Sequence, residues 1–117
     1  MIKVIVERQL KSWEDIGNLL FDLHMKAVQQ KGHISYETLI NNDNPRSVVV
    51  VSNWETLEDW KTWQSSKKRA RVASKINHLL AKKEVIKIYD VISPMDIVMY
   101  SDPAGWTQEQ EHPHFDG

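Results

Sequence analysis

VVVVSNWETLEDWKTW, residues 48–63, is the segment that decides the fold. Its four valines predict a strand that is buried on both faces, because β-branched side chains suit the pleated backbone. Thr56 followed by Asp59 three residues later resembles a capping box, with Asp in place of the usual Glu or Gln, so a helix is expected to begin there. A buried strand, a tight turn and a tryptophan-rich helix start therefore follow one another without a linker.

The rest of the chain also has sequence patterns that predict strands and helices. Alternating and β-branched stretches predict strands over residues 2–10, 33–41, 46–54 and 85–92. Helical spacing predicts helices over about 12–31, 56–63 and 65–82, with Ser12 capping the first helix and Gly32 ending it. The order is β-α-β-β-α-β. With a right-handed crossover in each half, it predicts the ferredoxin-like fold: a four-stranded antiparallel sheet with helices on one face.

The chain of 117 residues is expected to hold one domain, residues 1–92, and a C-terminal extension, residues 93–117. Within the extension, 96–100 is a candidate for one more short strand. Residues 95–106, which include the large apolar Trp106, are expected to pack on a partner subunit, and the last ten residues to fray.

A second copy is expected because the sheet has too much apolar surface for one layer of helices. The strand at 46–54 is apolar on both faces, and Ile5 lies on the face opposite Val4 and Val6. A soluble monomer rarely exposes an apolar face of that size. The residues therefore predict a homodimer in which the two sheets pack face to face.

Composition narrows the class of protein. A net charge of −1 argues against broad nucleic-acid binding, which needs a basic surface. The chain has no cysteine, which excludes disulfides and thiolate catalysis. No signal peptide and no apolar run of about 20 residues is present, so a cytoplasmic protein without a membrane partner is expected. His112 and His114 are a weak metal motif on a polar tail, and neither a metal nor a cofactor is predicted.

Two polar side chains are predicted to start from apolar helix faces. At 100° per residue His24 falls in the same arc as Leu20 and Leu23. It is either a proton carrier in a cavity or a core histidine with one hydrogen-bond partner. Arg69 projects between Ile76 and Leu80. It either binds an anionic or phenolate oxygen in a cleft or extends along the apolar surface to solvent.

Two aromatic side chains are candidates for the wall of a pocket. Trp63, one turn after Trp60, is placed to stack on a flat aromatic ligand, although core packing is the simpler use of a tryptophan. Tyr36 alternates with apolar residues on its strand, so it faces either that pocket or a dimer interface.

Several motifs together resemble the antibiotic biosynthesis monooxygenase (ABM) domain, a family of dimeric α/β barrels. The resemblance covers about residues 1–92 and rests on the opening strand, on KGHISYE at 31–37, on WETLEDW at 54–60 and on Leu79-Leu80. It implies the ferredoxin-like fold and sheet-to-sheet dimerisation. Members of the family include cofactor-independent monooxygenases of polyketide quinols, quinol oxygenases, haem-degrading enzymes and isomerases of small signalling sugars.

The resemblance to the haem-degrading branch is incomplete. That branch is expected to carry an asparagine, a tryptophan and a histidine at positions where this chain has Glu7, Trp63 and Ala73. Two of the three residues are missing, so haem degradation is disfavoured.

The function predicted from the resemblance is a cofactor-independent monooxygenase acting on a small aromatic quinol. His24 is the candidate base, Arg69 the candidate phenolate-binding group, and Trp63 and Tyr36 the candidate cavity walls. The alternative is a non-catalytic homodimer of the same fold that binds a small hydrophobic or aromatic molecule.

Overall fold

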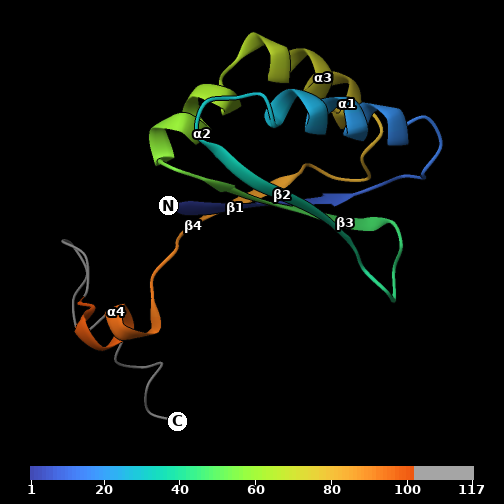
Figure 1. The fold of residues 1–117 in the computed structure, drawn as a ribbon. Coiled ribbons are helices and arrows are strands. Elements are labelled where there is room, and N and C mark those ends of the chain that lie inside the picture. Colours follow the sequence, from blue (N-terminus) through green and yellow to red (C-terminus); the bar gives the residue numbers. More distant parts are fainter. Residues whose placement is uncertain (102–117) are drawn as a thin grey trace.

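The computed structural model describes residues 1–101, which form four strands and four helices (Figure 1). In chain order these are β1 (Ile2–Gln9), α1 (Gly17–Ala27), β2 (His33–Ile40), β3 (Ser47–Trp54), α2 (Leu57–Gln64), α3 (Lys67–Asn77), β4 (Val85–Asp90) and α4 (Pro94–Met99).

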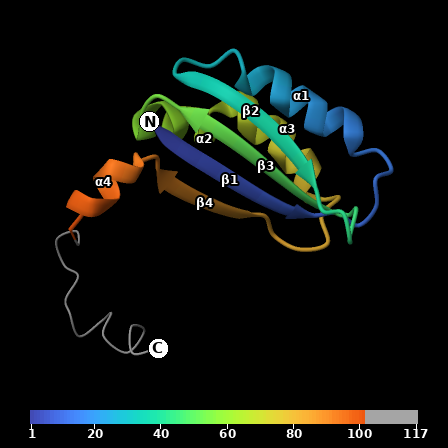
Figure 2. The same cartoon turned by 60° about the horizontal axis from the view of Figure 1, so that its bottom comes forward.

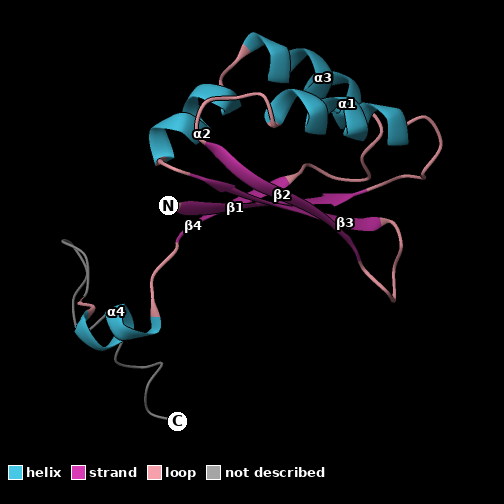
Figure 3. Ribbon diagram, in the orientation of Figure 1, coloured by secondary structure: helices cyan, strands magenta, loops and turns pink. Residues whose placement is uncertain are grey.

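The four strands form one antiparallel sheet in the order β2-β3-β1-β4 (Figure 2). Helices α1, α2 and α3 lie on one face of this sheet and leave the other face open (Figure 3). The predicted ferredoxin-like fold is therefore confirmed.

Alternation along the two central strands places their side chains on the two faces. On β1 the helix-facing residues are Ile2, Val4, Val6 and Arg8, and all four are buried. On β3 every second residue from Val48 to Trp54 is buried in the same way. Val49 and Val51 are only half-buried, because they lie on the open face. The expectation that β3 is buried on both faces is thus met on one face of the single chain.

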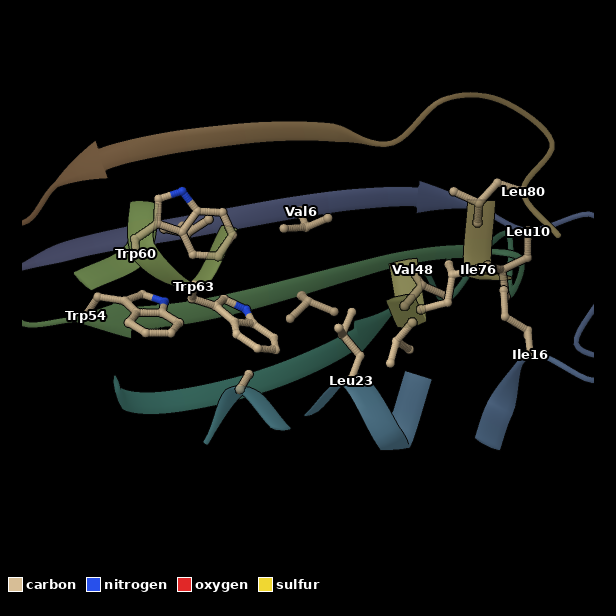
Figure 4. Packing of buried hydrophobic residues seen from close by; sticks show 14 of the residues in the cluster. Val6, Leu10, Ile16, Leu23, Val48, Trp54, Trp60, Trp63, Ile76 and Leu80 are labelled. Atoms are coloured by element: carbon tan, nitrogen blue, oxygen red, sulfur yellow. The ribbon is translucent and has the colours of Figure 1, made fainter. Parts of the chain in front are cut away.

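The core between helices and sheet changes character along its length (Figure 4). Aliphatic side chains such as Ile16, Val48 and Ile76 fill one end. Trp54, Trp60 and Trp63 gather at the other end, each no more than 3% exposed. The rings of Trp54 and Trp60 meet edge to face, with centroids 5.7 Å apart. The tryptophan end is where the core surrounds a cavity.

The predicted start of the tryptophan-rich helix is confirmed. The side chain of Thr56 accepts a hydrogen bond from the backbone N–H of Asp59, as an N-cap should. The turn before β2 meets this helix start directly. Gly32 has a φ of +84°, and a Cβ built there would collide with the Asp59 side chain, so only glycine fits.

The first and third helices are shorter than predicted. Ser12 does not cap α1: its hydroxyl accepts a hydrogen bond from the N–H of Glu14 in a turn. Asp15 then takes a φ of +64°, which no helix can contain, so α1 begins at Gly17. Ser66 caps α3, and that helix ends at Asn77.

The short strand expected at 96–100 is a helix instead. Ser93 and Asp96 form a reciprocal capping box, and Pro94 occupies the first turn, where its missing N–H is not needed. Helix α4 stands away from the domain on the open side of the sheet (Figure 1). Its apolar residues are exposed. Trp106, His112, His114 and the last ten residues lie outside the described part of the chain.

Within residues 1–101 no helix has the length and apolar character needed to cross a membrane.

Candidate functional site

A small cavity lies at the tryptophan end of the core, between the sheet and helices α1, α2 and α3. Its aromatic walls are Tyr36, Trp54, Trp60 and Trp63, and its volume is about 20 Å³. That volume holds about one water molecule and no aromatic ring. A larger ligand requires at least one wall residue to move.

Two buried arginines and one partly buried glutamate form an ionic network beside this cavity. Glu84, in the loop before β4, contacts both guanidinium groups: Oε1 lies 3.3 Å from Nε of Arg8, and Oε2 lies 3.3 Å from a terminal nitrogen of Arg69. Arg8 is 2% exposed and Arg69 7%. Both arginines line the cavity. Two positive charges and one negative charge leave a net charge of +1 at this wall.

The surroundings of the two guanidinium groups differ. Burial lowers the pKa of Arg8 from its ordinary value, and the neighbouring Glu84 carboxylate opposes that shift. Arg69 lies over the ring of Trp60, 5.6 Å from its centroid, in a cation–π contact. Arg69 therefore does not extend to solvent, and the alternative that it reaches water along the apolar surface is wrong.

Tyr36 forms the wall between the cavity and a second, outer hollow. This hollow has a volume of about 300 Å³, and its other lining residues are Leu20, Phe21, His24 and Thr38. Burial raises the pKa of the Tyr36 phenol above its ordinary value, although the charges of Arg8 and Arg69 oppose that rise. The phenol is therefore neutral at pH 7 and able to donate a hydrogen bond.

His24 lines the outer hollow and not the tryptophan cavity. Its ring packs edge to face on Tyr36 with centroids 4.1 Å apart. Its Nδ1 atom is buried and has no hydrogen-bond partner among residues 1–101. The imidazole is therefore not held in place by backbone carbonyls at this nitrogen.

The four residues proposed from the sequence thus occupy two neighbouring spaces. Tyr36, Trp63 and Arg69 line the tryptophan cavity, whereas His24 lines only the outer hollow. Tyr36 is common to both linings. Their roles toward a substrate stay predictions.

Sequence reasoning missed Arg8 and Glu84. Strand alternation contained the signal for Arg8, since Val4 and Val6 were already placed on one face and Arg8 continues that series. Glu84 lies in a loop, and no periodic pattern marks it. By contrast Glu7, compared above with a haem-site residue, points to the open face and pairs with Lys87 at 3.2 Å.

The described residues contain no group of three or more His, Asp or Glu side chains that would hold a metal ion. The two tail histidines, His112 and His114, lie beyond residue 101.

Known proteins resemble this chain in sequence and in fold. A family model described as "Antibiotic biosynthesis monooxygenase" matches residues 1–75. A search of curated proteins finds no match.

Several solved structures are similar. The crystal structure of an antibiotic biosynthesis monooxygenase has a TM-score of 0.73 and 18% identity, covering 80% of this chain and all of that one. A conserved protein from Methanosarcina mazei Go1 has a TM-score of 0.71 and 21% identity, over 75% of this chain and 89% of that chain. SnoaB, a cofactor-independent oxygenase from Streptomyces nogalater, has a TM-score of 0.72 and 9% identity, over 80% and 95% of the two chains. At these identities the likeness shows the fold alone.

Proposed function

The chain belongs to the antibiotic biosynthesis monooxygenase family, and we propose that it is a cofactor-independent monooxygenase of a small aromatic quinol. One observation carries the proposal: a cavity walled by three tryptophans and a tyrosine has two buried guanidinium groups at its side. Aromatic walls suit a flat ring, and guanidinium groups suit the oxyanion that the ring acquires when its phenol loses a proton.

The proposed reaction needs only the substrate and dioxygen. Loss of the phenol proton from an anthrone-type quinol gives an electron-rich anion. The reacting ring carbon, which is CH₂ in the anthrone form and C–H in this anion, then becomes C=O, and the net oxidation of CH₂ to C=O supplies four electrons to O₂. One oxygen atom forms the new C=O bond, and the other leaves as water with two protons.

In this proposal the charges beside the cavity assist the first step. A nearby positive charge favours the ionised form of a phenol, so Arg69 and Arg8 lower the pKa of the bound substrate. Tyr36, which is neutral at pH 7, donates a hydrogen bond to the same oxygen. His24 accepts the released proton at Nδ1, which is buried and has no hydrogen-bond partner among residues 1–101.

Substrate entry requires the two spaces to become one. Tyr36 is the shared wall, and rotation of its side chain would join the cavity of about 20 Å³ to the hollow of about 300 Å³. The combined space lies at the lower end of the range typical of small-molecule pockets. It would also bring His24 to the same pocket as Trp63 and Arg69.

We also propose that the protein is a homodimer through the open face of the sheet. Leu39 on β2 pairs with Val49 on β3 on that face. Leu39 is 46% exposed and Tyr89 on β4 is 50% exposed. A second sheet packed on this face would remove these side chains from water.

The second candidate function is binding of a small aromatic molecule without turnover. The observation that favours it is the position of His24, which lines the outer hollow and not the tryptophan cavity.

The test of the proposed function is oxygen uptake by the metal-free protein with dihydroxynaphthalenes and anthrone-type quinols. Uptake above autoxidation is expected, and His24→Ala should lower it at least about tenfold, the lower range for loss of an acid–base group. Tight binding of a quinol without uptake above autoxidation would favour the binding protein.

A further inference from the structure

The positive charge beside the cavity is permanent. Arginine stays protonated at any pH that the protein meets, and the described residues supply one carboxylate, Glu84, for the two buried guanidinium groups. A buried charge without a partner is unfavourable unless something pairs with it. One more negative charge at this site would complete the balance.

Most N–H donors of the two guanidinium groups are not used in the bonds to Glu84. The bonds to Glu84 involve only Nε of Arg8 and one terminal nitrogen of Arg69. Each guanidinium carries five N–H donors, and within residues 1–101 no other acceptor bonds either group. Glu84 contacts both guanidinium groups without lining the cavity, whereas Arg8 and Arg69 both line it.

We propose that the substrate is an aromatic acid whose carboxylate is already ionised when it enters, and that Arg8 and Arg69 bind this carboxylate in competition with Glu84. The inference rests on the proposed function and adds the substrate class to it. A phenol, with a pKa near 10, arrives neutral at pH 7, whereas a carboxylic acid, with a pKa near 4, arrives charged. Only the acid neutralises the permanent charge on entry.

Because Glu84 competes with the ligand carboxylate for the two arginines, removing the charge of Arg8 and removing the charge of Glu84 should have opposite effects on ligand binding. Removing the Arg8 charge takes away half of the proposed anion site. Removing the Glu84 charge takes away the competitor and leaves both guanidinium groups free for the ligand. Arg8→Met should therefore weaken binding of an aromatic acid, and Glu84→Gln should strengthen it.

The test is isothermal titration calorimetry of the full chain with three related probes: 1-hydroxy-2-naphthoate, its methyl ester and 1-naphthol. We expect the acid to bind at least about tenfold more tightly than the two neutral probes. Arg8→Met should weaken acid binding at least about tenfold, the lower end for a hydrogen bond to a charged group. Lys87→Met removes the same charge from the open face and is the matched control, with no change expected.

Equal binding of acid and ester, no binding of any probe, or an Arg8→Met effect no larger than that of Lys87→Met would overturn the inference. If Glu84→Gln does not fold, the Arg8 and Lys87 variants decide the question alone. Oxygen uptake separates this result from the proposed function. Turnover of neutral quinols without acid binding refutes only the substrate class. Acid binding without turnover of any hydroxylated acid or quinol refutes only the oxygenase.

Discussion

Glu84 is predicted to be the residue whose charge most affects stability. Its carboxylate is the shared partner of two guanidinium groups that are 2% and 7% exposed. Glu84→Gln keeps the size of the side chain but leaves two buried cations without a counter-charge. Removing one partner of a buried ion pair costs about 3–5 kcal/mol, and the Gln amide oxygen still accepts one hydrogen bond. We therefore expect a loss of about 3 kcal/mol in the free energy of unfolding.

The assay is urea unfolding followed by tryptophan fluorescence, at one fixed protein concentration because a dimer's stability depends on concentration. A loss of about 3 kcal/mol corresponds to a fall in melting temperature of roughly 10–20 °C for a domain of this size. The matched control is Asp22→Asn on α1, away from the open face. Asp22 pairs with Lys26, and their side chains are 45% and 34% exposed. Its loss should change stability by less than about 1 kcal/mol.

Arg8→Met tests whether the excess positive charge at the cavity wall is itself destabilising. It removes the excess positive charge and leaves one arginine with one carboxylate, so it should be less destabilising than Glu84→Gln. Equal losses for Glu84→Gln and Asp22→Asn would refute the argument from burial. A larger loss for Arg8→Met than for Glu84→Gln would refute the argument from charge balance.

Three further predictions concern Gly32 in the turn before β2, His33 at the start of β2, and the open face of the sheet. Gly32→Ala should lose at least about 1–2 kcal/mol in urea unfolding, because of its positive φ; Gly17→Ala, with open space around it, is the control and should lose nothing. Burial, followed by the nearby charge of His24, lowers the pKa of His33 in the folded state. The unfolded chain then binds more protons, so stability should fall as pH drops below about 6.5, and less steeply in His33→Gln. Leu39→Lys should shift the light-scattering mass from dimer to monomer; a dimer that persists would contradict the open-face interface.

Most of the fold was predictable because it follows from local patterns. The valine run, the Thr56 cap and the strand alternation each depend on residues close in sequence, and the structure confirms the elements they predict. The errors were in the ends of two helices and in the type of the element at 96–100. The start of α1 is set by the left-handed conformation of Asp15, and α4 by a capping box that overrides the β-branched residues Ile97 and Val98.

The candidate site was predictable only in part. Helical spacing placed Arg69 on an apolar face, and strand alternation would have placed Arg8 beside it. Neither pattern could show that the two arginines share Glu84, which is 76 residues from Arg8 in sequence. Nor could the helix wheel show that His24 lines the outer hollow and not the tryptophan cavity.

The sequence by itself determined the order of strands and helices over residues 1–92 and the family, because periodicity and capping act over a few residues. The tertiary structure decided the division between cavity and hollow at Tyr36 and the net charge of +1 at the cavity wall. Those properties depend on which distant side chains meet in the interior. In the interior charges are screened less than at the surface, so the balance of charges matters more there.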